Sequence, residues 1–126
     1  MTAPLVLIVN DHAASLYLVG KLLRAAGFRT AEARTGNDAL AAARAGDAPP
    51  AVVLLDVHLP DLSGLEVCRR IKADPDTRAI KIVHTSAATV TPQNRQDSAE
   101  AGADGYLAQP FQPDELVAAV RAVAAS

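Results

Sequence analysis

The chain of 126 residues is 50% hydrophobic and 21% charged, and its formal net charge at pH 7 is −2. This balance is typical of a single soluble globular domain; it argues against a disordered chain and gives no support to nucleic-acid binding. The single cysteine, Cys68, excludes an intramolecular disulfide and a multi-cysteine metal site, and no apolar run approaches the roughly 20 residues that span a bilayer.

The N-terminal segment MTAPLVLIVND predicts a first strand rather than a signal peptide, because it has no basic start and reaches Asp11 too early. We therefore expect a cytoplasmic protein. A first helix follows, in which Leu16, Val19 and Leu23 recur with helical spacing, and Gly27 stands where helices often end.

Further apolar runs alternate with helical segments along the rest of the chain. After PLVLIV the runs are FRTAEA, AVVLLD, IKIVHT and DGYLAQ. The runs PLVLIV, AVVLLD and IKIVHT are nearly continuous in Val, Ile and Leu, which is typical of parallel strands covered on both faces. The later helices are predicted at Asn37 to Ala45 with a stop at Gly46, about Gly64 to Ala73, Pro92 to Ala101, and Pro113 to about Ala124. The segment from Pro92 is polar almost all round and has the weakest amphipathic pattern.

Such an alternation predicts an α/β fold with a doubly wound parallel sheet. Right-handed crossovers place the ligand site of such a sheet at the carboxyl ends of its strands. The residues that follow the runs there are Asn10, Asp11, Asp56, His58, Thr85, Ser86, Gln109 and Pro110.

Two carboxylates, Asp11 and Asp56, follow different strands and should meet at one edge of the sheet. A cation between them would allow both to stay ionised, and hard oxygen ligands suit Mg²⁺. Such a site could neutralise a phosphoryl group moving onto a carboxylate, which can act as the nucleophile. Ser86 could donate its hydroxyl to a phosphoryl oxygen.

With these residues in order, the chain resembles a response-regulator receiver domain of two-component systems from end to end. Asp56, between VVLL and VHLPDLSGLEVCRRIK, matches the family's phosphoacceptor, and Asp11 matches an acid that holds magnesium. Ser86 in HTSA matches the hydroxyl switch residue and Tyr106 its aromatic partner, and GADGYLAQPF resembles the closing motif. The sequence is also similar to receivers attached to hybrid sensor histidine kinases.

The resemblance implies one receiver domain over residues 1–126, with a five-stranded (βα)5 flavodoxin-like sheet in the order 2-1-3-4-5. It implies Mg²⁺ held by Asp11, Asp56, the backbone carbonyl of His58 and, through water, Asn10. It also implies a cis bond between Gln109 and Pro110. The partner would be a sensor histidine kinase or a phosphotransfer protein, with an output domain or partner protein downstream and neither nucleic acid nor membrane bound by this domain.

Two positions depart from the family pattern. The family usually has two adjacent acids after the first strand, where this chain has Asn10 followed by Asp11. It usually has a lysine before the last proline, where this chain has Gln109. Glutamine can donate a hydrogen bond to a phosphoryl oxygen but lacks the charge that makes such a bond roughly twice as strong. Because one negative and one positive charge are lost, we hypothesise that the two changes compensate electrostatically.

Each candidate residue also has a structural interpretation. Asp11 alone could cap the first helix, and Asp61 and Ser63 are typical turn residues. His84 suits a satisfied core or interface position, whereas His12 suits a solvated helix start and His58 an exposed rim. Cys68 suits a half-buried apolar position, and the basic residues Arg69, Arg70 and Lys72 suit the solvated side of a helix.

Three functions compete at this point. The first is a receiver that accepts a phosphoryl group on Asp56 and then remodels the surface of its fourth helix, fifth strand and fifth helix, assisting its own phosphotransfer without being an enzyme. The second is a degenerate receiver that binds partners independently of phosphorylation, which Asn10 and Gln109 favour. The third is an enzyme on a similar sheet. A flavodoxin-like site would need a hydroxyl-rich and glycine-rich loop in place of NDHAAS, and a haloacid-dehalogenase-type phosphatase would need an acid in place of His58.

Overall fold

Five parallel strands form one sheet in the order β2-β1-β3-β4-β5. A computed structural model of the chain describes residues 3–44, 49–86 and 92–125. The strands are β1 (Leu5–Val9), β2 (Arg29–Ala33), β3 (Val52–Asp56), β4 (Lys81–Ser86) and β5 (Gly105–Ala108). The helices are α1 (Ala13–Ala25), α2 (Gly36–Ala43), α3 (Gly64–Ala73), α4 (Pro92–Glu100) and α5 (Pro113–Ala124). The predicted fold class and strand order are confirmed.

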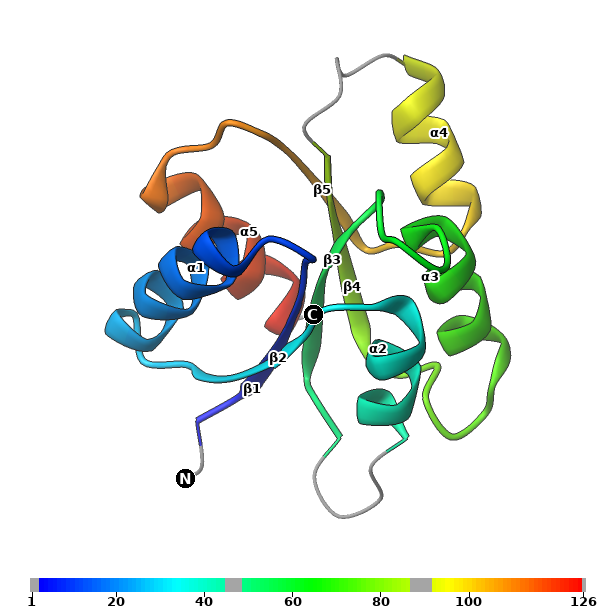
Figure 1. Cartoon of the computed structure of the whole chain (residues 1–126), viewed down its shortest axis with the longest axis horizontal. Coiled ribbons are helices and arrows are strands. Elements are labelled where there is room, and N and C mark those ends of the chain that lie inside the picture. Colours follow the sequence, from blue (N-terminus) through cyan, green and yellow to red (C-terminus); the bar gives the residue numbers. More distant parts are fainter. Residues whose placement is uncertain (1–2, 45–48, 87–91, 126) are drawn as a thin grey trace.

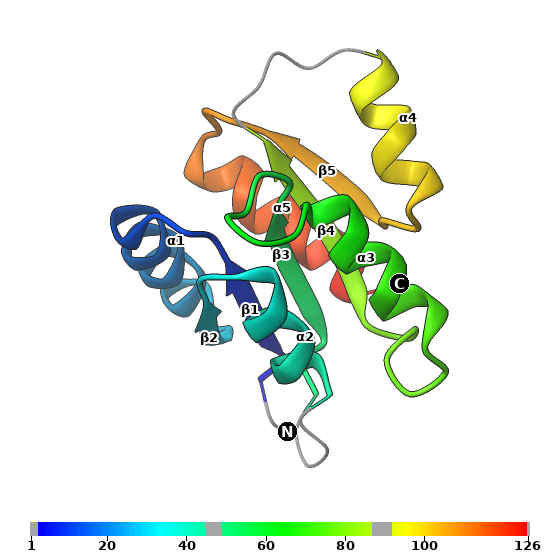
Figure 2. The same cartoon turned by 45° about the vertical axis from the view of Figure 1, so that its right-hand side comes forward.

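The sheet lies between two layers of helices, with α1 and α5 on one face and α2, α3 and α4 on the other (Figures 1 and 2). Alternate residues of β1 serve the two layers, because successive side chains of a strand point to opposite faces. Val6 and Ile8 join the core under α1 and α5, whereas Leu7 and Val9 join the core under α2 and α3. Burial on both faces explains why β1 reads as a continuous apolar run.

The strand register brings the predicted site residues to one edge of the sheet. Val9 pairs with Leu55, so the segment that follows β1 lies beside the end of β3. Asp56 pairs with Thr85, and Ser86 pairs with Ala108. The carboxyl ends of β1, β3, β4 and β5 therefore meet at the upper edge of the molecule in Figure 1.

Helix ends follow local signals, with one difference in length. α1 ends before Gly27, whose φ of +100° is a conformation that glycine adopts without strain. α2 ends at Ala43, earlier than the predicted Ala45, and the predicted stop at Gly46 lies outside the described residues. Ser63 is the N-cap of α3, where its hydroxyl accepts a hydrogen bond from Glu66 N at 3.1 Å.

Two predictions about the burial of residues in α3 were wrong. Cys68 is fully buried rather than half-buried, and burial raises the pKa of its thiol to about 11. Lys72 does not belong with the solvated Arg69 and Arg70, because its ammonium donates to the Ile80 carbonyl at 2.7 Å and to Asp104 Oδ2 at 3.0 Å. Lys72 thus links α3 to the residues that immediately precede β4 and β5.

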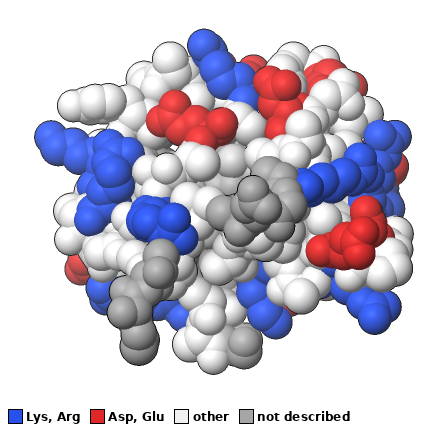
Figure 3. All heavy atoms as spheres, turned by 90° about the horizontal axis from the view of Figure 1, so that it is seen from below, with Lys and Arg blue, Asp and Glu red and all other residues white. Residues whose placement is uncertain are grey.

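The surface at the amino ends of the strands mixes charges of both signs. Figure 3 shows Lys and Arg interspersed with Asp and Glu over the coloured part of that face. Among the helices that the structure describes, none is long and apolar enough to cross a membrane.

Candidate functional site

Asp56 ends β3 with its carboxylate half-buried at the carboxyl edge of the sheet. Its Oδ1 accepts a hydrogen bond from the backbone N–H of His58 at 3.0 Å. Burial raises the pKa of Asp56 above its ordinary value and outweighs the hydrogen bond and the charge of His58, which lower it; the negative charge of Asp11 adds to the rise. The two predicted carboxylates therefore act on each other, as expected from their neighbouring strands.

Asp11 has a buried oxygen that is not hydrogen-bonded. Its Oδ1 lies 3.0 Å from His12 Nδ1 but without hydrogen-bond geometry, so it lacks a hydrogen-bond partner among the described residues. The imidazole of His12 is exposed and lies 3.3 Å from Asn10 Oδ1. Because a buried carboxylate oxygen that accepts no hydrogen bond is costly, and in the described part of the chain only the His12 ring is recorded near this one, the atom fits a ligand that supplies positive charge.

Asn10 is buried, with 7% of its surface exposed. Its side-chain Oδ1 accepts a hydrogen bond from His12 N at 2.9 Å, and its own N–H donates to the Ala33 carbonyl at 3.1 Å. His12 is the N-cap residue of α1 and makes no side-chain cap. The amide of Asn10 thus holds the start of the helix, a role that the structural interpretation assigned to Asp11.

The residues present fit Mg²⁺. Among the described residues, no group of three or more His, Cys, Asp or Glu side chains converges on one point. A cation beside Asp11 and Asp56 would therefore add neutral oxygens, carbonyl and water, to two carboxylates. Mg²⁺ is bound in this way, through one or two carboxylates with several retained waters.

Gly64 supports the backbone behind Asp56. Its N–H donates to the Val57 carbonyl at 2.7 Å. A Cβ at Gly64 would lie 2.7 Å from Val57 Cα and closer still to the Asp56 carbonyl oxygen. Only a glycine allows α3 to begin this close to the segment that presents the carboxylate.

Ser86 and Tyr106 line a hollow of about 230 Å³, here called the switch hollow, together with Val57, His58, Leu65, Asn94 and Asp97. Ser86 is the last residue of β4, and its carbonyl accepts a hydrogen bond from Gln109 N at 2.9 Å. The guanidinium of Arg95 lies over the Tyr106 ring, 5.3 Å from its centroid. The structure thus brings both predicted switch residues to the side of Asp56 that faces α4.

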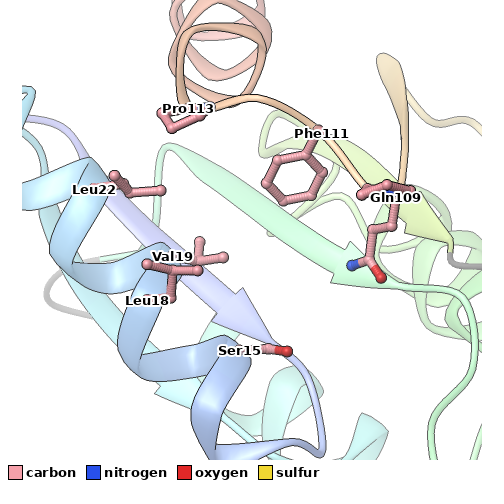
Figure 4. A pocket seen from close by; sticks show the side chains of 8 residues that line it. Ser15, Leu18, Val19, Leu22, Gln109, Phe111 and Pro113 are labelled. Carbon is pink, nitrogen blue, oxygen red and sulfur yellow. The ribbon is translucent and has the colours of Figure 1, made fainter.

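Gln109 lies between Ser86 and a second, larger cavity. This apolar hollow of about 520 Å³ lies between α1 and the β5–α5 connection and is lined by Ser15, Leu18, Val19, Leu22, Gln109, Pro110, Phe111 and Pro113. In Figure 4, Ser15 and Gln109 lie at the end of the hollow nearer the strands' carboxyl ends, and Leu22 and Pro113 lie farther away. The Gln109–Pro110 bond is cis.

Comparisons with known proteins show the family and the fold. The family model described as the response regulator receiver domain matches residues 6–121. The chain belongs to this family. The receiver is 41% identical over 117 residues to the DNA-binding response regulator MtrA of Mycobacterium tuberculosis, a match that covers 93% of this chain and 49% of MtrA. The chain therefore spans about half the length of the curated relatives that it matches.

Solved structures place the receiver among proteins of the same fold. A putative response regulator from Chloroflexus aurantiacus is 31% identical, has a TM-score of 0.91, and the match covers 98% of this chain and 99% of that one. The receiver domain of the sensor histidine kinase PA1611 from Pseudomonas aeruginosa is 27% identical with a TM-score of 0.87, and the match covers 98% and 99% of the two chains. The PA1611 structure has a magnesium ion coordinated in its active-site cleft.

Two interactions near the receiver site were not predicted. Asp61, expected only to form a turn, accepts hydrogen bonds from Gly36 N at 2.7 Å and Asn37 N at 2.8 Å and so caps α2. These hydrogen bonds lower the pKa of Asp61. His84 is fully buried with both ring nitrogens in hydrogen-bonding contact, which confirms the core interpretation but adds a specific pair of partners. The sequence signal for Asp61 was its place in LPDLSG, but its partner lies 25 residues away.

Proposed function

We propose that residues 1–126 form a single cytoplasmic receiver domain that accepts a phosphoryl group on Asp56. The observation that carries this proposal is the half-buried Asp56 carboxylate, with a raised pKa, beside the buried Asp11 oxygen that lacks a hydrogen bond. A carboxylate oxygen of Asp56 attacks the phosphorus of a phosphohistidine, the P–N bond breaks, and the imidazole leaves with the nitrogen electron pair. The product is an acyl phosphate on Asp56.

The ligands of Mg²⁺ would be Asp11, Asp56, the His58 carbonyl and, through water, Asn10. Bound there, Mg²⁺ would neutralise charge on the transferred phosphoryl group. The buried amide of Asn10 fixes the segment that carries Asp11, and the His58 N–H already binds one Asp56 oxygen. The other Asp56 oxygen is the candidate nucleophile.

Ser86 and Gln109 would bind the phosphoryl oxygens. The backbone bond between Gln109 N and Ser86 O keeps the two residues adjacent. Movement of Ser86 toward the phosphoryl group would open space for Tyr106 within the switch hollow and release its contact with Arg95. Because Arg95 belongs to α4 and Tyr106 to β5, this movement would change the surface made by α4, β5 and α5.

The donor would be a sensor histidine kinase or a phosphotransfer protein. Any donor protein must cover the surface around Asp56 to bring its phosphohistidine within reach. The apolar hollow adjoins that surface at Gln109, and its rim carries the 56% exposed Leu18. An output domain or partner protein would read the switched surface. The receiver assists its own phosphotransfer and does not turn over a separate substrate, and it binds neither nucleic acid nor membrane itself.

A second candidate function is a degenerate receiver that binds partners without phosphorylation. Gln109 favours it, because an amide cannot supply the full positive charge that a lysine would bring to a phosphoryl oxygen. Asn10 favours it as well, because its side-chain oxygen is already used as an acceptor at the start of α1.

The two functions are separated by incubating the purified chain with acetyl phosphate and Mg²⁺, and again with a chelator, and measuring the intact mass. A receiver gains one phosphoryl group only with Mg²⁺, and Asp56→Asn gains none. If the wild type gains no phosphoryl group at any donor concentration, the degenerate receiver is the better account.

A further inference from the structure

A buried histidine joins the start of α3 to α4. His84, in β4, has 0% of its surface exposed. Its Nε2 lies 3.0 Å from the Gly64 carbonyl oxygen, and its Nδ1 lies 2.6 Å from Ser98 Oγ. These contacts link a strand of the sheet to two helices of the same layer, and the site described above uses none of them.

The partners fix how the imidazole is protonated. A backbone carbonyl only accepts hydrogen bonds, so Nε2 carries the proton and donates to Gly64. Nδ1 then accepts a hydrogen bond from the Ser98 hydroxyl. Burial lowers the pKa of His84, in agreement with the neutral form. We call the chain of contacts from Gly64 through His84 to Ser98 the bridge. Both ring nitrogens of His84 therefore have a partner in it, as expected of a buried polar network that specifies one arrangement.

At its α3 end the bridge reaches the segment that presents Asp56. Gly64 donates its N–H to the Val57 carbonyl at 2.7 Å, and Val57 donates its own N–H to the Thr85 carbonyl at 3.0 Å. The Cα of Gly64 packs against the Asp56 carbonyl, where no Cβ would fit. A displacement of the Asp56–Val57 backbone would therefore displace the carbonyl that His84 binds.

At its other end the bridge holds α4, which also contacts β5 through the Arg95 guanidinium over the Tyr106 ring. All residues of α4 are described, and Ser98 is the one that is buried. The helix is otherwise polar around its circumference, so apolar burial contributes little to its position. The hydrogen bond to His84 is thus the contact made by the buried side chain of α4.

We propose that His84 is a positioning residue that couples the Asp56 segment to α4 through Gly64 on one side and Ser98 on the other. The link is separate from the contact between Tyr106 and Arg95. Its role in signalling rests on the proposed function of Asp56, whereas its role in holding α4 does not. When Asp56 is modified, the shift of its backbone passes along the bridge and α4 moves with it.

Amide hydrogen exchange of α4 in the full chain tests the bridge without any phosphorylation. Ser98→Ala leaves Nδ1 of His84 unsatisfied and His84→Leu removes both hydrogen bonds, so each should speed exchange of the α4 amides about 5- to 150-fold. His84→Gln, whose amide can both donate and accept, should restore part of the protection. The matched control is Gln96→Ala, which removes only an exposed bond to Glu100 on the same helix. Ser98→Ala keeps the core intact, so it serves as the test even if His84→Leu does not fold. If the α4 amides of Ser98→Ala exchange at the same rate as those of the wild type, the proposal is overturned.

Coupling to Asp56 is read from the same amides before and after treatment with acetyl phosphate and Mg²⁺. In the wild type, modification should change α4 exchange at least threefold, and in Ser98→Ala this response should shrink although the mass shift is retained. If modification changes α4 exchange as much in Ser98→Ala as in the wild type, the proposed coupling is wrong. If the wild type gains no phosphoryl group, the proposed function fails, and the exchange of the unmodified variants still decides whether His84 holds α4.

Discussion

Gly64→Ala tests whether the start of α3 supports the backbone segment that carries Asp56. The added Cβ would lie 2.7 Å from Val57 Cα, which is about 0.8 Å inside the ~3.5 Å at which carbon atoms pack comfortably. The atoms it meets belong to the backbone of residues 56–57, so no side chain can rotate to relieve the contact. Either α3 or the end of β3 must move.

Overpacking of this kind costs about 1–3 kcal/mol, and the helical preference of alanine over glycine offsets at most ~1 kcal/mol of it. Because the added atom meets backbone, the upper figure applies, and we expect Gly64→Ala to lower the free energy of unfolding by about 2 kcal/mol. Because the displaced backbone carries Asp56, the rate of phosphorylation by acetyl phosphate should also fall.

The assay is equilibrium unfolding in urea. If the dependence of the unfolding free energy on urea concentration has the same slope in both proteins, the shift in midpoint reports the change in stability alone. The matched control is Gly20→Ala in α1, where the added Cβ would meet the far end of the Arg24 side chain, at 2.8 Å, rather than backbone. That variant should be stabilised by up to ~1 kcal/mol. If Gly64→Ala is as stable as the wild type and is phosphorylated at the same rate, the supporting role of Gly64 is wrong.

Three further predictions follow from the site and its surroundings. With a chelator present, Asp56→Asn should be more stable than the wild type at pH 7. Burial raises the pKa of Asp56 above 3.8, so the stability of the wild type falls as the pH rises through that raised value. The stability advantage of the variant should therefore vanish toward pH 3. A less stable Asp56→Asn at pH 7 in urea unfolding would contradict the burial argument. Ser63→Ala removes the cap on Glu66 N and should cost about 1 kcal/mol by the same assay, whereas Ser63→Asp should keep most of the stability. Asn10→Asp and Gln109→Lys, made singly and together, should change the phosphorylation rate non-additively, and strictly additive effects would refute compensation between them.

The elements that the sequence predicted correctly are those whose signal is local. The continuous Val, Ile and Leu runs of β1, β3 and β4 follow from burial on both faces, and Gly27 ends α1 because its backbone requires a positive φ. Even the polar helix α4 was placed within one residue, since Pro92 opens it and its residues have adequate helical propensity.

What the sequence did not predict depends on residues far apart in the chain. Asp61 caps α2 across the top of the sheet, and Lys72 binds Asp104, 32 residues away. The apolar hollow exists only because α1 lies beside the β5–α5 connection, so neither Leu18 nor Phe111 carries a local sign of it. Burial of Asn10 likewise depends on how the chain enters α1 next to Ala33.

The most direct test of the central claim is to locate the phosphoryl group within the chain. The chain is treated with acetyl phosphate and Mg²⁺, the acyl phosphate is reduced with borohydride, which converts the modified aspartate to homoserine, and the peptides are sequenced by mass spectrometry. We expect homoserine at position 56 alone, and none after treatment with a chelator. Homoserine at position 11, or at neither carboxylate in a chain that has gained a phosphoryl group, would contradict the assignment of Asp56 as the phosphoacceptor.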